Sequence, residues 1–472
     1  MSISIATLSD GRSVRYIPEI IGQGAEKRFY YTEDKSSVIG LYLEPNKDAI
    51  MRRKRLDNIL GKFNPTIGDK NASYWKNLFC WPTGIVEKPS IGILCPAYPS
   101  NYKFKNGALK GREKQGLWYF GDKCPKLVDP SEKGEWKDFF AGCIVLSRAV
   151  RRLHMAGLAH SDLSHKNILL DPNTRSSIVI DIDTLVVPGL YPSKLLGTTG
   201  YIAPEVYETM YMPIENPKRK LPSIYTDRHA LAILIYRFLL QRDPLEGPKV
   251  HSKDPDENEL LWRGKEAIFI ENPSDKSNRP NDIKVPFTVL GKPLGDLFLQ
   301  VFVDGLHDPE KRPTAPQWES ALLKTWDMIL PCPNTNCTYK SFVLSDPKNT
   351  RCPCCGTKLS GSMPILTLLK ESRPGQWTSN GELIVHSKTA LYAWHVFDHI
   401  LPGPDVDRSR QAYFALHGGK WILINEKLSS LYSSTGNLVP PGKAVELIDG
   451  ARIRLSNEPR GQMVEVRIIN SK

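Results

Sequence analysis

The 472-residue sequence predicts an α+β protein in which a domain of strands followed by helices precedes a cysteine-rich segment and a small all-β domain. Over residues 15–328, short strand-like runs come first and longer segments with helical spacing follow. Five of the nine cysteines lie between residues 332 and 355, a density that predicts metal ligation rather than disulfides. Residues 363–472 contain short β-type runs separated by Gly, Pro and Asn, which predict a β-sandwich.

Local patterns predict the elements of the first domain in order. Strands are expected over 16–21, 37–43 and 91–98, and helices over 49–60, 139–156 and 221–240. Two further short apolar runs, 168–170 and 178–180, have the character of strands. The domain therefore has a strand-rich half followed by a helical half.

The composition indicates soluble globular material, because 40% of the residues are hydrophobic and 24% are charged. No run of about 18 apolar residues occurs, and the first residues lack a basic stretch followed by an apolar core. We therefore expect a cytoplasmic protein without a membrane span. The net charge of +12 is compatible with acidic partners, but runs such as 52–55 are most simply solvated faces. Basic residues are not interleaved with aromatic ones, so no nucleic-acid partner is expected.

Three short motifs in the helical half contain the residues that phosphoryl transfer requires. A His-Ser-Asp sequence ends at Asp162, Asn167 follows five residues later, and Asp181 and an Ala-Pro-Glu sequence at 203–205 come after it. One carboxylate must receive the proton of the substrate hydroxyl, while an Asn and a second carboxylate hold the magnesium ions that bridge the nucleotide phosphates. A lone Asp beside a turn is more often a cap. The three motifs in this order resemble the catalytic core of protein kinases.

That resemblance implies a bilobal protein kinase-like domain over residues 15–328, with ATP and Mg²⁺ (or Mn²⁺) as cofactors. Asp162 would be the base, and Asn167 and Asp181 the metal ligands. Asp227 matches the residue that braces the catalytic loop in the family, although it is equally well explained as a helix cap. An Arg near the end of the domain, Arg312, would form a buried ion pair with the Glu of Ala-Pro-Glu.

The phosphate-binding part departs from the family. Gly22 and Gly24 match the Gly-rich loop, but Lys27 stands at the third glycine position. The strand that usually carries a phosphate-binding Lys has none, and Gly40 or Leu41 stands in its place. Either the chain is a pseudokinase scaffold that binds nucleotide and partner proteins without efficient transfer, or Lys27 supplies the missing charge. The second arrangement resembles the "with no lysine" kinases and is favoured, because Gly40 would leave room for the Lys27 side chain.

Other ATP-site residues follow from the same resemblance. The hinge between the lobes would place Cys95 and Ala97 against the nucleotide. The helix that should orient the lysine contains no Glu, so Asp57 is the best-spaced substitute, although it is equally well explained as a surface residue. Asp183 replaces the Gly of Asp-Phe-Gly and would supply an extra metal ligand or merely a turn. Ser161 replaces the Arg of His-Arg-Asp, so control through a pair between that Arg and a phosphorylated loop is not expected.

A narrower resemblance rests on a Trp-Pro pair at 81–82 and on the His-x-Asp-Leu-Ser-x-x-Asn form of the catalytic loop. These features resemble bacterial kinases found with TerY-type proteins and phosphatases in tellurium-resistance phosphorylation triads, and the related YegI-like kinases. The resemblance implies serine/threonine-type phosphorylation of protein substrates. It also implies a co-encoded TerY-like protein and a phosphatase as partners.

The cysteine-rich segment predicts a zinc ribbon over residues 329–360. Two knuckles, Cys-x4-Cys and Cys-x2-Cys, provide Cys332, Cys337, Cys352 and Cys355 as four thiolates, and Cys354 is a spare that could compete with Cys352. The site should be structural, because a filled tetrahedral shell leaves no position for an activated water. Redox chemistry is the weaker alternative.

Residues 363–472 resemble a forkhead-associated (FHA) domain in their final hairpin. The ligand loops match poorly, and only Ser409 and Arg410 are candidate phosphate contacts. Arg410 is equally well explained as a surface charge. The sequence therefore predicts a degenerate FHA-like module used for docking rather than a phosphothreonine reader.

Overall fold

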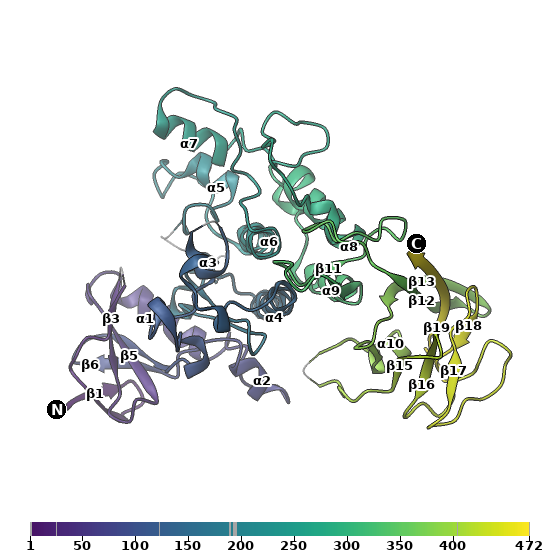
Figure 1. The fold of residues 1–472 in the computed structure, drawn as a ribbon. Helices are drawn as coiled ribbons and strands as arrows, with labels where there is room; N and C mark the ends of the chain where they lie inside the picture. Colours follow the sequence, from purple (N-terminus) through teal and green to yellow (C-terminus); the bar gives the residue numbers. More distant parts are fainter. Residues whose placement is uncertain are drawn as a thin grey trace. The chain divides into compact units, whose positions relative to one another are not determined.

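The structure is a computed structural model that describes residues 2–24, 26–121, 123–187, 190–191, 196–403 and 405–471. Ala25 of the predicted Gly-rich loop and, within the predicted domains, positions 122, 188–189, 192–195, 404 and 472 lie outside the described residues. The chain divides into two compact units (Figure 1). The first comprises residues 1–283 and 296–319, and the second comprises 284–295 and 320–472. Within the part of the chain that the structure describes, no helix is long and apolar enough to cross a membrane.

The first unit begins with a seven-stranded antiparallel sheet of order β2-β1-β6-β7-β5-β4-β3. Its strands are β1 (Ser4–Leu8), β2 (Ser13–Tyr16), β3 (Gly22–Gln23), β4 (Lys27–Tyr31), β5 (Ser37–Tyr42), β6 (Gly84–Lys88) and β7 (Gly92–Pro96). The strands predicted over 37–43 and 91–98 are thus confirmed. Strand β1 lies before the expected domain start at residue 15, and residues 17–21 are not a strand, which corrects both expectations.

Helix α1 (Ala49–Leu60) has the bounds that the sequence predicts. Its Leu56 and Ile59 are fully buried, because residues three apart in a helix lie on one face. Leu56 packs with Tyr42 and Ile93 of the sheet in one apolar cluster. The contact attaches α1 to the sheet at the end of β5, close to the start of β4 that pairs with it. A short helix, α2 (Ala72–Lys76), follows.

The helical half is built around α4 (Trp136–Met155) and α6 (Ile224–Leu240) (Figure 1). Both helices contain long apolar stretches. Helix α6 begins after Ser223, whose side chain accepts a hydrogen bond from the Tyr225 amide. Most residues of α6 are buried, and most of these are apolar. The other helices are α3 (Cys124–Leu127), α5 (Pro204–Thr209), α7 (Pro255–Arg263), α8 (Lys292–Leu299) and α9 (Ala315–Trp326). The predicted helices over 139–156 and 221–240 are confirmed with small shifts at their ends.

A short hairpin, β8 (Ile168–Asp171) and β9 (Ser176–Val179), joins the two predicted metal ligands. The strands pair antiparallel with Ile168 opposite Val179, so the residues just before β8 and just after β9 meet at one end. The Ile180 amide donates to the Asn167 carbonyl at 3.0 Å. The hairpin therefore brings Asn167 and Asp181 together although they are fourteen residues apart.

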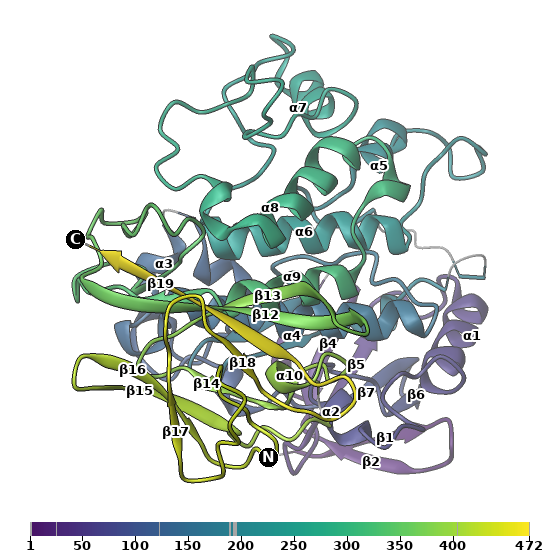
Figure 2. The same cartoon turned by 90° about the vertical axis from the view of Figure 1, so that its right-hand side faces the viewer.

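The second unit holds a two-stranded hairpin and a β-sandwich. The hairpin pairs β10 (Ile329–Pro331) with β11 (Ser341–Val343). The sandwich strands are β12 (Gly361–Arg373), β13 (Gln376–Ile384), β14 (Ala390–Leu391), β15 (Ala412–His417), β16 (Lys420–Asn425), β17 (Ala444–Glu446), β18 (Arg452–Arg454) and β19 (Met463–Ser471), with α10 (Ala393–Val396) between β14 and β15. They form sheets of order β13-β12-β19-β18 and β14-β15-β16-β17 (Figure 2). Leu366 and Val464 of one sheet share an apolar core with Phe414 and Leu423 of the other.

The predicted pair between Arg312 and Glu205 is present. The Arg312 guanidinium donates to both Glu205 carboxylate oxygens at 2.8 and 2.7 Å, and its side chain is 0% exposed. It also donates to the carbonyls of Gly305 and Leu306. A planar guanidinium with this many acceptors joins α5 to the segment that precedes α9.

Replacing Arg312 with Leu should lower the free energy of unfolding by about 3–5 kcal/mol, because the substitution leaves the Glu205 carboxylate without its cation. The measurement is a urea unfolding curve followed by tryptophan fluorescence. The matched control is Arg15→Leu, which removes an exposed pair with Glu33 and should leave the midpoint unchanged. An Arg312→Leu midpoint equal to that of the wild type would contradict the structural role of the pair.

Candidate active site

The catalytic loop is held by the carboxylate of Asp227, which lies in the first turns of α6. Asp227 Oδ2 accepts a hydrogen bond from the His160 amide at 2.7 Å, and Oδ1 accepts one from the Ser161 amide at 3.1 Å. Ser161 has a left-handed backbone with φ of 65°, which a residue adopts only where its surroundings compensate the strain. Ser223, not Asp227, caps α6. The bracing role that the sequence indicates for Asp227 is therefore confirmed.

The Asp162 carboxylate is fixed from two sides. The Asn167 side-chain amide donates to Asp162 Oδ2 at 3.0 Å and to its carbonyl at 2.8 Å. The Thr198 backbone amide donates to Asp162 Oδ1 at 2.6 Å. Gly197 beside it has φ of 110°, and a Cβ there would lie 3.2 Å from the Ser161 carbonyl, so this close approach requires glycine. Sequence reasoning missed Thr198, and the Gly-Thr pair shortly before Ala-Pro-Glu is the signal that indicates it.

Lys27 reaches the Asp181–Asp183 segment from the sheet. It is the first residue of β4 and lies directly opposite Tyr42 of β5, so both side chains point to the same face. Lys27 is 4% exposed. Its Nζ lies 2.6 Å from both carboxylate oxygens of Asp183 and 3.3 Å from Asp181 Oδ1. A lysine at the third glycine position therefore does contact the predicted metal ligand.

Charges in this cluster stabilise one another. Burial opposes the charged form of Lys27, but the carboxylates of Asp183 and Asp181 outweigh it and raise the pKa of Lys27 well above its usual range. Burial opposes ionisation of Asp183 as well, yet Lys27 lowers the pKa of that carboxyl. Burial and then Asp183 raise the pKa of Tyr42, whose hydroxyl donates to Asp183 Oδ2 at 2.5 Å. The cluster thus joins an ammonium, a carboxylate and a protonated phenol.

Two expectations about the lysine environment are wrong. Asp57 does not orient Lys27, because its side chain is 53% exposed and pairs with Arg53 one turn earlier on α1. Gly40 does not make room for the lysine either. A Cβ there would meet the Phe29 ring at 3.0 Å, because Phe29 is the residue opposite Gly40 in the β4–β5 register.

The structure places three of the predicted nucleotide contacts, Gly22, Cys95 and Ala97, in different surroundings. A Cβ on Gly22 would meet none of the described atoms within 4 Å, so packing inside this part of the chain does not require a glycine there. Cys95 packs against an apolar cluster that includes Leu169 of β8 and Ile180, the residue directly before Asp181. The Ala97 amide donates to the Ser36 carbonyl at 3.0 Å, which occupies the donor that a hinge residue would offer to a base.

The four predicted zinc ligands come together. The sulfur atoms of Cys332, Cys337, Cys352 and Cys355 all lie within 4.8 Å of one another, and Cys354 is not part of this set. The Cys332–Cys355 and Cys337–Cys352 sulfur separations are 3.6 and 3.8 Å. Four sulfurs at about 2.3 Å from a tetrahedral zinc would be about 3.8 Å apart, so the arrangement fits that ion.

The candidate phosphate contacts of the sandwich are engaged within their own domain. Arg410 donates to both carboxylate oxygens of Glu426, at 2.6 and 2.5 Å, and lies over the Tyr413 ring. The Ser409 hydroxyl donates to Asp407 at 2.5 Å. The positive charge of Arg410 is thus already balanced.

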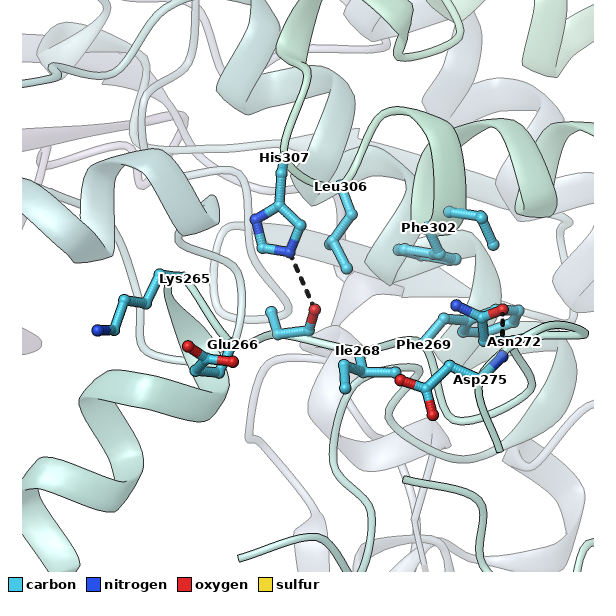
Figure 3. A pocket seen from close by; sticks show the side chains of 11 residues that line it. Lys265, Glu266, Ile268, Phe269, Asn272, Asp275, Phe302, Leu306 and His307 are labelled. Carbon is cyan, nitrogen blue, oxygen red and sulfur yellow. Dashed lines mark hydrogen bonds between the residues drawn. The ribbon is translucent and has the colours of Figure 1, made fainter. Parts of the chain in front are cut away.

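A pocket of about 250 Å³ opens elsewhere in the first unit (Figure 3). Its walls come from residues 265–275 and 302–307, and none of the predicted site residues lines it. His307 Nε2 lies 3.0 Å from the Ala267 carbonyl on its wall. The candidate active site and this pocket are formed by different residues.

Two curated proteins resemble part of the chain. The chain is 29% identical over 178 residues to the serine/threonine-protein kinase WNG2 of Toxoplasma gondii, covering 35% of this chain and 31% of that protein. It is 28% identical over 169 residues to the serine/threonine-protein kinase ppk21 of Schizosaccharomyces pombe, covering 32% of this chain and 28% of that protein. The chain therefore spans less than a third of the length of these relatives.

Solved structures resemble the chain as well, among them two from Toxoplasma gondii. One is the kinase domain of a specific rhoptry antigen, with 16% identity and a TM-score of 0.41 over 69% of this chain and 86% of that chain. The other is a rhoptry kinase, with 15% identity and a TM-score of 0.42 over 69% of this chain and 84% of that chain.

The family match covers the helical half and leaves out the sheet that carries Lys27. Residues 132–324 match the family described as the protein kinase domain. This span includes Asp162, Asn167 and Asp181, together with the Arg312–Glu205 pair. Residues 132–324 are therefore similar to protein kinase domains, and the similarity includes the catalytic-loop residues that the sequence predicts.

Proposed function

We propose that this chain is an ATP- and magnesium-dependent protein kinase that phosphorylates Ser or Thr of protein substrates and takes its phosphate-binding lysine from position 27. The observation that carries the proposal is the buried ammonium of Lys27, 3.3 Å from the Asp181 carboxylate. A charge at this position lies where the phosphates of a nucleotide on the metal ligands would need it. The serine/threonine-protein kinase relatives support the same substrate class.

Asp162 is suited to act as the base. Its two oxygens are oriented by the Thr198 amide and the Asn167 side chain, so the carboxylate is positioned before a substrate binds. A substrate hydroxyl beside it would pass its proton to this carboxylate as the phosphoryl group is transferred. A Mn²⁺ or Mg²⁺ ion would be held by Asp181 and the amide oxygen of Asn167, since hard cations take oxygen ligands. An ion held there would neutralise phosphate charge.

The remaining ATP-site assignments belong to the same proposal. Gly22 and Gly24 would let the backbone approach the phosphates, which agrees with the open space beside Gly22. Cys95 would line the apolar surface against the adenine ring of the nucleotide, together with Leu169 and Ile180. Ala97 would contribute only its position in the hinge, because its amide is already bonded to Ser36.

A pseudokinase scaffold is the alternative, and one observation favours it. Lys27 and a metal ion would compete for the Asp181 carboxylate, since the ammonium already lies 3.3 Å from Oδ1. Catalysis requires Lys27 to exchange this contact for a phosphate oxygen when nucleotide and metal bind. A chain in which that exchange fails would bind nucleotide without efficient transfer.

Incubating the full chain with labelled ATP and Mg²⁺ should transfer phosphate to the chain itself or to a generic Ser/Thr acceptor. Asp162→Asn should reduce kcat by about 10²–10⁴-fold, because it removes the base. Lys27→Met should reduce kcat/KM by about 10²–10³-fold, because it removes charge stabilisation of the transferring group. The matched control is Asp57→Asn on the exposed face of α1, which should keep the wild-type rate.

No transfer by the wild type, even to co-encoded proteins, would favour the scaffold. A fully active Lys27→Met would leave the kinase assignment and overturn the lysine.

We also propose that the four-cysteine cluster holds a structural zinc ion. The cluster provides four thiolates for a tetrahedral ion, and the β10–β11 hairpin is too small to supply a core of its own. Hydrogen bonds from Thr357, through its side chain and then its amide, lower the pKa of the Cys355 thiol to about 6, which favours the thiolate that a metal requires.

Cys332→Ser should lower the bound zinc from about one ion per chain to well below that and reduce the melting temperature, because three thiolates bind zinc more weakly than four. Cys354→Ser is the matched control and should keep both values, since Cys354 lies outside the cluster. Zinc is measured with a chromogenic chelator on protein denatured after dialysis. Equal zinc content in the two variants would contradict the ligand assignment.

The partners implied by the narrower resemblance complete the proposal. They are protein substrates, a co-encoded TerY-like protein and a phosphatase, in the cytoplasm of a bacterium with tellurium-resistance genes. The β-sandwich would serve as a degenerate FHA-like docking module. The Arg410–Glu426 pair supports docking rather than phosphothreonine reading, because a phosphate would have to displace Glu426.

A further inference from the structure

We propose that Asp183 is the positioning residue for Lys27 and holds the lysine in place of an acidic residue from helix α1. The inference rests on the proposed role of Lys27 and deepens it. It starts from the two contacts of 2.6 Å that join Lys27 Nζ to both oxygens of Asp183. By comparison, the nearest Asp181 oxygen is 3.3 Å away. Lys27 is therefore centred on Asp183 and only reaches toward Asp181.

Burial makes this pairing obligatory for the lysine. The side chains of Lys27 and Asp183 are 5% and 1% exposed, whereas that of Asp181 is 33% exposed. An ammonium removed from water needs a carboxylate removed from water beside it, because a solvated carboxylate compensates poorly for the lost hydration. Asp181, being partly in solvent, is the carboxylate that remains accessible to a cation.

Tyr42 fixes the carboxylate in turn. Its hydroxyl donates to Asp183 Oδ2 at 2.5 Å, and its ring packs in the cluster between the sheet and α1. Because Tyr42 lies opposite Lys27 in the β4–β5 register, the same pair of strands positions the lysine and the donor that orients its partner. Both oxygens of Asp183 are thus occupied, which distinguishes Asp183 from a metal ligand and from a residue that merely forms a turn.

Helix α1 contributes a different kind of contact. Its one acidic residue, Asp57, is paired with Arg53 on the exposed face. From the same helix, the Arg52 guanidinium lies 4.0 Å from the centre of the Tyr42 ring. The helix therefore touches the lysine cluster through a cation on an aromatic face and supplies no carboxylate to Lys27.

The test is a double-mutant cycle on ATP affinity in the full chain, measured by displacement of a fluorescent ATP analogue. Lys27→Met should weaken ATP binding by about tenfold or more in the wild-type background, as expected for a charged hydrogen bond to phosphate. In the Asp183→Asn background, the same substitution should change the affinity by less than about twofold, because the lysine is no longer held in position. In the Asp57→Asn background, the full effect should remain.

Two results would overturn the inference. One is an effect of Lys27→Met that is the same with and without Asp183→Asn. The other is an Asp183→Asn variant that needs as much additional Mg²⁺ for ATP binding as Asp181→Asn does, which would make Asp183 a metal ligand. The cycle measures binding, so a wild type that binds ATP without transferring phosphate would overturn the proposed kinase activity and still test Asp183.

Thermal unfolding tests the pair if a variant folds poorly or if the wild type binds no ATP. Lys27→Met should lower the melting temperature, because it leaves the Asp183 carboxylate buried without its cation. Adding Asp183→Asn should restore part of that loss, because the remaining groups are neutral. A double variant that melts at or below Lys27→Met would overturn the pairing.

Discussion

The first unit depends on the burial of one positive charge. Lys27 is 4% exposed, and its ammonium is compatible with that environment only because carboxylates 154 and 156 residues away in the sequence come to meet it. This requirement attaches the N-terminal sheet to the segment that follows β9. A displacement of the sheet relative to that segment would expose the ammonium or strip it of its partner, so the charge pair specifies how the two halves of the unit meet.

Backbone constraints then supply the rest of the site. The β8–β9 hairpin places Asn167 and Asp181 at one end, and the Asp227 carboxylate fixes the turn that presents Asp162. The Thr198 amide adds a donor from the segment before α5. All of these residues lie within 132–324, the range that matches the protein kinase domain. The positions that differ from the motifs of protein kinases collect instead around Lys27, where the lysine, its partner and the glycine of the strand all differ.

Local sequence patterns were sufficient to predict the helices and strands that bury one continuous apolar face. Helix α1 has its predicted bounds, and the β5 and β7 strands follow apolar runs. The strand expected over residues 16–21 failed because Pro18 cannot donate to a ladder and because Ile20 and Ile21 are 50% and 44% exposed. Strand β1 was missed, since its place in the sheet depends on pairing with β6 some eighty residues later in the sequence.

The site shows the same division. Asp162, Asn167 and Asp181 were found because chemistry dictates their types and spacing. The partner of Lys27 was not, because it depends on which residues face each other across β4 and β5 and on the turn that holds Asp183. Spacing along α1 favoured Asp57 instead. The contact between Phe29 and Gly40 depends on the pairing register of two strands, which neither strand's sequence predicts by itself.

The link between α1 and the cluster, Arg52 lying over the Tyr42 ring, has a pharmacological consequence. A small molecule that wedges α1 away from the sheet would remove a cation from an aromatic face and leave the Lys27–Asp183 pair intact. A molecule that turns the 181–183 segment would remove the lysine anchor and the proposed metal ligand together. Compounds that engage the segment after β9 should therefore disturb the surroundings of Lys27 more than compounds that displace the helix.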